Sequence, residues 1–371
     1  MQLVEGRTPW LGVLACVSLA GVARIHACAP DDPRTAPRLV WVGDGYVAIW
    51  EGRDGDLSVV RAAKLSATGA KRTRAVGRTV WRSDELQSRA MLAGGDKTAL
   101  VVALEGPDPD PDPDEDRSDP LRFLVALPLG ADGRELGAPR TFGLADRICA
   151  SPTWDGARFA VGFAYRMRYF GDDWSLHLAG ITADGRSARD HLIASGDFRG
   201  CAVARHGDVL AVVVAVEDRT TRRYSIVAYL VGTRDYELLG RPLVLVDGEE
   251  RSPWPEVVAE CDGWAVSFAD DAGVVRLVRF DRDGVRGAAK LDRVDAKTMS
   301  LGSNATGAFV AWHASGQIRV RSVDGGGGTR SVGRAPRTET AAAGHDGECA
   351  IAWDDGKGAV IARTPSCSRP E

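Results

Sequence analysis

A short phrase recurs seven times along the 371 residues of this chain: a strand-like segment, a tight turn with glycine, and a dense apolar segment. The turn glycines of the seven copies are Gly45, Gly95, Gly156, Gly207, Gly263, Gly307 and Gly347. Successive glycines are separated by 40 residues (Gly307 to Gly347) to 61 residues (Gly95 to Gly156). Self-similarity at such a period is typical of repeat architectures, in which each unit buries its apolar face against the next.

The strands within each unit differ in how much of them must be buried. The second segment is apolar at consecutive positions, as in residues 209–216 (VLAVVVAV), so both of its faces must be buried. The third segment alternates apolar and polar residues, as in residues 274–281 (VVRLVRFD), so one of its faces is exposed to solvent. A four-stranded sheet that is most deeply buried near its second strand suits a propeller blade, because neighbouring blades stack face to face. We therefore predict an all-β fold, a β-propeller of seven blades, with six as the alternative count.

The last unit, residues 341–364, has no fourth strand of its own. Propellers can close their ring by borrowing a strand from the other end of the chain, which leaves no open edge. We predict that an N-terminal strand, at residues 33–37, completes this blade. The predicted organisation is a signal peptide at 1–28, a linker and closing strand at 29–37, the propeller at 38–365 and a tail at 366–371.

The repeated phrase of residues 38–365 resembles that of secreted bacterial β-propeller repeat proteins, lipoproteins among them. The resemblance implies the architecture and an exported location. It implies no activity, because propellers serve as hydrolases, lyases, carbohydrate binders and scaffolds alike.

The N-terminal residues indicate export. Residues 11–23 carry no charge, which fits the apolar part of a signal peptide and is too short to span a membrane. Ile25-His26-Ala27-Cys28 resembles a bacterial lipobox, which implies lipid attachment at Cys28, although His26 departs from the usual small residue. Cys16 ends a second lipobox-like run, and cleavage near Ala27 or Ala29 without lipid is a further alternative. We expect a periplasmic, outer-membrane-anchored or secreted protein that touches membrane only through such a lipid.

Charge argues against a nucleic-acid partner. The chain has 47 Lys and Arg against 51 Asp and Glu, a net charge of −4, whereas a dedicated nucleic-acid binder would show a basic face. The Pro-rich segment 107–119 is predicted to be an extended acidic loop. Its acids Asp108, Asp110, Asp112 and Asp119 have the spacing of a calcium loop, but Pro113 stands where a turn glycine is needed. We predict no metal site and no cofactor.

Cysteine positions predict disulfides instead of a zinc site, because no C-x-x-C pair is present. Cys149 and Cys201 begin the first strands of consecutive units, and first strands line the channel of a propeller. We expect these two residues to bridge neighbouring blades. Cys349 and Cys367 are candidates for tying down the C-terminal tail, and buried free thiols are the alternative for both pairs.

One face of the predicted propeller carries the long, varied connections, and variable loops on a rigid scaffold are common binding sites. There the second strands end in an apolar and then a polar residue, and further aromatic residues lie in loops. The candidate ligand-binding residues are Trp50, Glu51, Glu105, Tyr169, Phe170, Trp174, Glu217, Trp254, His313 and Asp354. For any one residue of the repeated pattern, packing between blades or a solvated strand end is the alternative.

Motifs for catalysis are missing: the sequence contains neither G-x-S-x-G nor H-E-x-x-H. We therefore expect a monomeric, exported, non-catalytic propeller that binds a protein, peptide or glycan at the cell envelope. The alternative is a glycan hydrolase or lyase with carboxylates at the channel mouth. That enzyme would need two carboxylates about 5–10 Å apart in a deep pocket, and we name no catalytic residue.

Overall fold

The computed structural model describes 12 stretches of the chain: residues 37–66, 72–86, 90–106, 121–166, 174–186, 188–250, 254–291, 294, 298–323, 328–336, 338–355 and 359–364. Regular structure in these stretches consists of 29 β-strands. None of these stretches contains a helix with the length and apolar character needed to cross a membrane.

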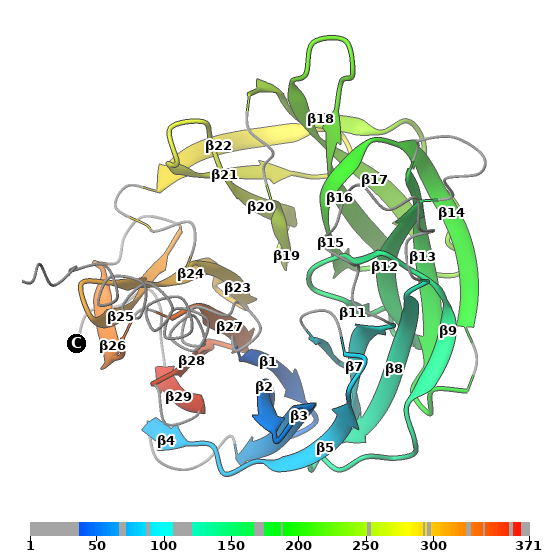
Figure 1. The fold of residues 1–371 in the computed structure, drawn as a ribbon. Helices are drawn as coiled ribbons and strands as arrows, with labels where there is room; N and C mark the ends of the chain where they lie inside the picture. The colour runs from blue at the N-terminus through cyan, green and yellow to red at the C-terminus, as the bar shows by residue number, and fades with distance from the viewer. Residues whose placement is uncertain are drawn as a thin grey trace, which may run out of the picture. The chain divides into compact units, whose positions relative to one another are not determined.

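The strands form seven antiparallel sheets that follow one another around a central channel (Figure 1). The all-β, seven-bladed propeller predicted from the repeats is therefore confirmed. Blade 1 consists of β1 (Arg38–Val42), β2 (Gly45–Asp54), β3 (Leu57–Ser66) and β5 (Arg78–Ser83). Blade 2 consists of β6 (Met91–Gly94), β7 (Thr98–Glu105), β8 (Phe123–Gly130) and β9 (Arg140–Leu144). Blade 3 consists of β10 (Arg147–Ile148), β11 (Thr153–Trp154), β12 (Arg158–Arg166), β13 (Trp174–Thr182) and β14 (Ala188–Gly196).

The remaining blades keep the same order from the channel outward. Blade 4 consists of β15 (Phe198–His206), β16 (Val209–Glu217), β17 (Tyr224–Gly232) and β18 (Leu243–Glu249). Blade 5 consists of β19 (Glu256–Glu260), β20 (Gly263–Ala269), β21 (Val275–Phe280) and β22 (Val285–Leu291). Blade 6 consists of β23 (Ser300–Asn304), β24 (Gly307–Ala314), β25 (Gln317–Ser322) and β26 (Arg330–Arg334). Blade 7 consists of β27 (Thr340–His345), β28 (Glu348–Asp354), β29 (Ala359–Thr364) and β4 (Arg72–Arg74).

Blade 7 is completed from the N-terminal part of the chain, but by a different segment from the one predicted. β4 pairs antiparallel with β29, with Thr73 opposite Ile361. Of the expected segment 33–37, residues 33–36 lie outside the described residues, and Pro37 precedes β1 without belonging to a strand. The prediction is therefore corrected. The chain first lays down three strands of blade 1, then crosses to blade 7 for β4, and returns to blade 1 for β5.

The apolar second strands occupy the most deeply buried position in each blade. Eight of the nine residues of β16 are buried, whereas β25 alternates half-buried and buried residues from one end to the other. Each of the seven junctions between neighbouring blades has its own cluster of buried apolar side chains, contributed by both blades. The propeller therefore has no single core. Its stability is shared among seven similar interfaces.

Two of these junctions place a tryptophan ring against a glycine. Trp353 of β28 is fully buried and lies where a side chain on Gly333 of β26, in blade 6, would have to go. Trp50 of β2 is buried likewise against Gly77, with Ala63 and Ala359 around it. The repeated tryptophan at the end of the second strand therefore packs between blades, which was the alternative to its predicted role in ligand binding.

We expect the Gly333→Ala variant to lose about 1–3 kcal/mol of unfolding free energy, because its Cβ would overlap the Trp353 ring in a packed junction. Denaturant unfolding followed by tryptophan fluorescence measures this. Gly143→Ala is the matched control, since Gly143 also lies in an outermost strand (β9) and has open space where a Cβ would stand. Equal stability of the two variants would contradict the tight contact.

The inner strands of blades 3 and 4 are joined covalently. Cys149 and Cys201 form a disulfide, as predicted, and lie 52 positions apart in sequence. Beside it, Ala150 pairs with Ala202 in a parallel bridge, and the Ala150 amide donates to the Cys201 carbonyl over 2.7 Å. Cys349 is also disulfide-bonded. Its predicted partner, Cys367, lies outside the described residues. The disulfides are compatible with export to an oxidising compartment.

Replacing both Cys149 and Cys201 by Ser should lower the unfolding free energy by about 4 kcal/mol, the chain-entropy value for a loop of this length. Thermal or denaturant unfolding compares this variant with wild type, with and without reductant. Cys261→Ser serves as the control, because Cys261 is exposed and free. A double variant as stable as wild type in oxidising buffer would show that the bridge contributes nothing to the fold.

Candidate functional site

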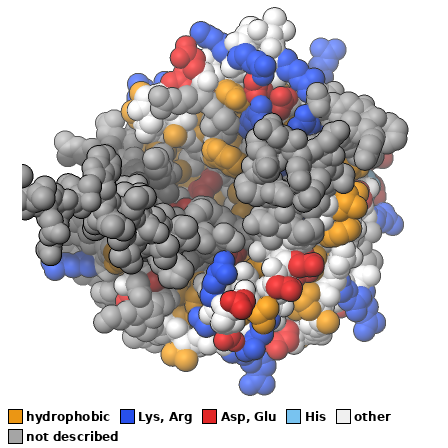
Figure 2. Space-filling view, in the orientation of Figure 1, with side chains coloured by type: hydrophobic (Ala, Val, Ile, Leu, Met, Phe, Trp, Pro, Cys, Tyr) orange, Lys and Arg blue, Asp and Glu red, His pale blue; other side chains and the backbone are white. Residues whose placement is uncertain are grey.

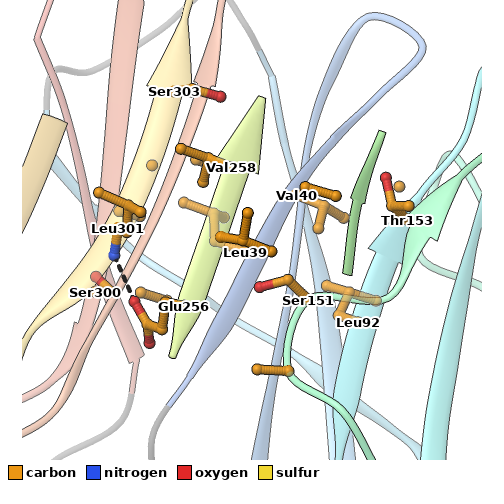
Figure 3. A pocket seen from close by; sticks show the side chains of 18 of the residues that line it. Leu39, Val40, Leu92, Ser151, Thr153, Glu256, Val258, Ser300, Leu301 and Ser303 are labelled. Atoms are coloured by element: carbon orange, nitrogen blue, oxygen red, sulfur yellow. Dashed lines mark hydrogen bonds between the residues drawn. The ribbon is translucent and has the colours of Figure 1, made fainter. Parts of the chain in front are cut away.

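The first strands of the blades line the central channel. A narrow section of about 360 Å³ is lined by residues of all seven blades (Figure 3). Small and aliphatic side chains dominate it, among them Leu39, Leu92, Val258 and Leu301. In this section the Glu256 carboxylate accepts a hydrogen bond from the Leu301 amide over 2.7 Å, which ties blade 5 to blade 6.

A wider cavity of about 810 Å³ adjoins the narrow section. The two share Arg38, Met91, Ala150 and Glu256, which lie near the beginnings of the first strands. The wide cavity is further lined by ends of second strands, such as Leu104 and Ala269. It therefore opens on the face that carries the second-to-third and fourth-to-first connections, the face singled out from the sequence.

The wide cavity combines an apolar floor with charged residues. Its larger apolar side chains are Met91, Leu104, Ile148, Phe198, Phe268 and Met299. Its charged residues are Arg38, Arg122, Arg147, Arg199, Asp146, Glu256 and Glu339. Trp254, also lining the cavity, is 69% exposed. A concave apolar site with a few charged groups is the usual form of a ligand pocket. Trp254 is the member of the predicted set that lies there.

Arg147 is held by neutral groups. Its Nη1 donates to the Phe198 carbonyl (2.9 Å) and to the Arg199 carbonyl (3.0 Å), and its guanidinium lies 4.2 Å from the centre of the Trp174 ring. Burial lowers the pKa of Arg147, and the positive charge of Arg199 lowers it further. Trp174, predicted as a ligand residue, therefore supports a cavity residue from the side.

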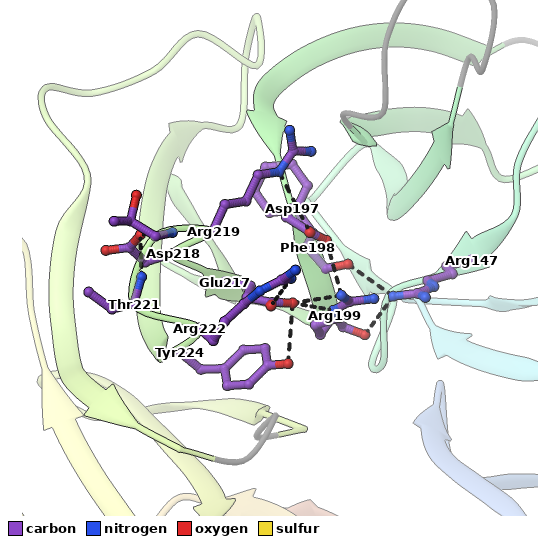
Figure 4. Close-up of polar contacts among 11 residues, drawn as sticks. Arg147, Asp197, Phe198, Arg199, Glu217, Asp218, Arg219, Thr221, Arg222 and Tyr224 are labelled. Carbon is purple, nitrogen blue, oxygen red and sulfur yellow. Dashed lines mark hydrogen bonds and ion pairs between the residues drawn. The ribbon is translucent and has the colours of Figure 1, made fainter.

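Glu217 lies in an arginine clamp beside the cavity (Figure 4). The carboxylate accepts hydrogen bonds from Nη2 of Arg199 (2.6 Å), Nη1 of Arg222 (2.9 Å) and the Tyr224 hydroxyl (3.3 Å). The hydrogen bonds from the two arginines lower the pKa of Glu217 to about 2. Its side chain is 4% exposed and does not line the wide cavity, so its acceptor sites are taken up within blade 4.

We expect Glu217→Gln to cost about 1–2 kcal/mol of unfolding free energy at neutral pH, since solvent screens the exposed Arg222. The folded-state pKa lies below the ordinary 4.5, so the stabilisation is present above that pH and declines as pH falls toward 2. The stability gap between wild type and variant should therefore narrow in acid. Glu237→Gln, at an exposed position of the same blade, is the control. A gap that does not change with pH would rule out the ion pairs as its source.

The other two predicted glutamates are also engaged at blade junctions. Glu51 accepts a hydrogen bond from the Ala90 amide, and Glu105 accepts one from the Trp81 indole over 3.0 Å. Each bond connects blade 1 with blade 2 or the segment leading into it. Glu51 and Glu105 are not among the described residues that line the wide cavity. The convergence of Glu51, Glu105 and Glu217 in one cavity, which the hydrolase alternative invoked, is not found.

The remaining predicted residues lie elsewhere. His313 is half-buried in β24, and its Nε2 is 3.2 Å from the Ala335 carbonyl. Asp354 ends β28, away from the lining of the wide cavity. Tyr169 and Phe170 fall outside the described residues, as does the acidic segment 107–119. In the stretches that the structure covers, no group of three His, Cys, Asp or Glu residues is placed to hold a metal ion.

The sequence reasoning missed the arginines of the cavity because it followed the second strands. Arg38, Arg147 and Arg199 all stand at or beside the beginning of a first strand, so the signal was present at a repeated position. Around the face shown in Figure 2, Lys and Arg side chains are interspersed with Asp and Glu, and hydrophobic side chains lie between them.

Comparison with known proteins supports the architecture and no more. No protein-family model and no curated protein matches the chain. It is similar to the β-propeller domain of Cps50 (Swd1) from Myceliophteria thermophila, with a TM-score of 0.51 and 11% identity over 88% of this chain and 96% of that domain. It is also similar to Trypanosoma rangeli sialidase in complex with the inhibitor DANA, with a TM-score of 0.47 and 11% identity over 89% of this chain. The chain spans about half (54%) of that sialidase. At such identities the likeness shows the fold alone.

Proposed function

We propose that this chain is a non-catalytic β-propeller that binds a protein, peptide or glycan at the cell envelope, and that the ligand enters the wide cavity. The observation that carries the proposal is the cavity itself. Its volume is about 810 Å³, and it joins an apolar floor, four arginines and the exposed Trp254. Exposed aromatic residues beside apolar pockets are frequent anchors of binding.

A binding role accounts for the carboxylates better than catalysis does. The three glutamates predicted for the channel mouth are each bonded to a blade junction or an arginine clamp. Among the described residues three acids line the cavity, and two of them are used by the scaffold: Glu256 accepts from the Leu301 amide, and Asp146 accepts from the Arg166 amide over 2.9 Å. Acids used in this way hold the scaffold, which argues against the pair of free carboxylates that glycan hydrolysis requires.

We further propose that the chain is exported, to the periplasm, to the outer membrane through a lipid on Cys28, or to the medium. The uncharged run at 11–23 and the lipobox-like residues before Cys28 support this, and the Cys149–Cys201 disulfide agrees with it. Residues 1–36 lie outside the described residues. Partition of the expressed protein between detergent and water distinguishes lipid anchoring from free secretion.

The binding proposal predicts that Trp254→Ala weakens ligand binding by about tenfold or more, as the loss of an aromatic anchor does. Glycan-array and pull-down screening of the full chain supplies the ligand, and titration of wild type and variant measures the affinity. Val244→Ala is the control, because Val244 is also largely exposed but lies on the outermost strand of blade 4. Affinity unchanged by Trp254→Ala, or turnover of a bound glycan, would overturn the proposal.

A further inference from the structure

Two of the arginines in the wide cavity have no carboxylate partner among the described residues. Arg147 is bonded only to backbone carbonyls and stacked on Trp174, at the distances given above. Arg122, which directly precedes β8, is half-buried, and its side chain makes no hydrogen bond or ion pair with a described residue. Arg199 differs from both, since the Glu217 carboxylate neutralises it.

A partly buried cation without a counter-charge is costly, because desolvation is not repaid by an ion pair. At Arg147 the burial and the nearby Arg199 both disfavour the charged form, as the lowered pKa shows. The negative charges of Asp146 and Asp197 act in the opposite direction, but neither carboxylate forms an ion pair with Arg147, and the effects of burial and of Arg199 are larger. An anion that entered the cavity would supply the missing partner and would be held by charge-assisted hydrogen bonds.

The floor next to these arginines selects among anions. The half-buried Met91, Ile148 and Met299 offer aliphatic surface, whereas Leu104 and Phe268 are almost fully buried and present little. A sugar would leave its hydroxyl groups unpaired over such a floor, at a cost for each group. An apolar amino-acid side chain fits the same surface without that cost. The cavity therefore favours a peptide that is acidic and apolar at adjacent positions.

We propose that the wide cavity binds a peptide segment of a partner protein in which an Asp or Glu side chain stands next to a large apolar residue. Arg122 and Arg147 hold the carboxylate, and the floor takes the apolar side chain. Trp254, at the exposed edge, contacts the rest of the segment. This inference rests on the proposed binding function and specifies its ligand.

The test selects phage-displayed random heptapeptides on the immobilised full-length protein. Enriched peptides should carry Asp or Glu beside Leu, Ile, Phe or Met. The best sequence is then made as a C-terminally amidated peptide, together with its Asn or Gln analogue, and titrated against wild type. We expect the amide analogue to bind at least about tenfold more weakly, the usual scale for a lost charged hydrogen bond.

On the protein side the test is Arg122→Gln, which breaks no hydrogen bond or ion pair with a described residue and is therefore expected to fold. This variant should bind the acidic peptide about tenfold more weakly than wild type does. It should bind the amide analogue with the same affinity as wild type, because the arginine and the carboxylate form one interaction that either change removes. Arg122→Lys should recover part of the affinity. Arg140→Gln, which removes an exposed arginine from β9 in the same blade, is the matched control and should change affinity less than twofold.

The outcomes separate this inference from the function on which it rests. Peptides that bind with no preference for an acid, or with no loss on Arg122→Gln, would overturn the assignment of the carboxylate while the cavity remained a binding site. An oligosaccharide that binds through Trp254 when no peptide does would overturn the ligand class alone. If neither peptides nor oligosaccharides bind in a way that depends on the cavity, both proposals fail.

Discussion

The face-to-face burial of one blade against the next is the interaction on which everything else in this structure depends. Each blade is a single sheet, of five strands in blade 3 and four in the others, that cannot bury both faces by itself, and the apolar second strands would be exposed without neighbours. Seven separate apolar clusters supply this burial, one at each junction. Apolar contact holds neighbouring blades together. Polar and covalent links, such as the Glu256–Leu301 hydrogen bond and the Cys149–Cys201 disulfide, then fix how the blades are aligned.

The scaffold explains why arginines line the wide cavity while Glu51, Glu105 and Glu217 do not. Second strands end deep in the blade junctions, so the polar residues that follow them meet neighbouring blades: Glu51 meets Ala90, and Glu105 meets Trp81. First strands begin at the channel, so Arg38, Arg147 and Arg199 line the wide cavity. Residue type alone does not determine whether a side chain serves the fold or a ligand. Its position along the strand decides that.

More of the architecture than of the candidate site could be predicted from this sequence. The apolar run at 209–216 predicts a strand buried on both faces, because this signal lies within the strand itself. The Cys149–Cys201 disulfide could be predicted because the two cysteines occupy the same position in consecutive repeats. The closing strand could not be predicted in the same way. Arg72–Arg74 has three residues and no apolar period, and it becomes a strand by pairing with the outer edge of β29, whose other edge pairs with β28. The clamp on Glu217 likewise depends on Arg199, which lies 18 positions away and is brought close by a hairpin.

Closure by β4 also bears on how the molecule is made. Synthesis starts at the N-terminus, so Arg72–Arg74 leaves the ribosome long before Ala359–Thr364, its partner in blade 7. Throughout that interval blade 1 and the blades after it can stack in order, while the ring stays open at one junction. The waiting strand is short, which makes it a poor template for pairing with another nascent chain. Closure of the ring is thus deferred until Ala359–Thr364 has been synthesised, and a chain truncated before β29 is left with a gap that no other described strand fills.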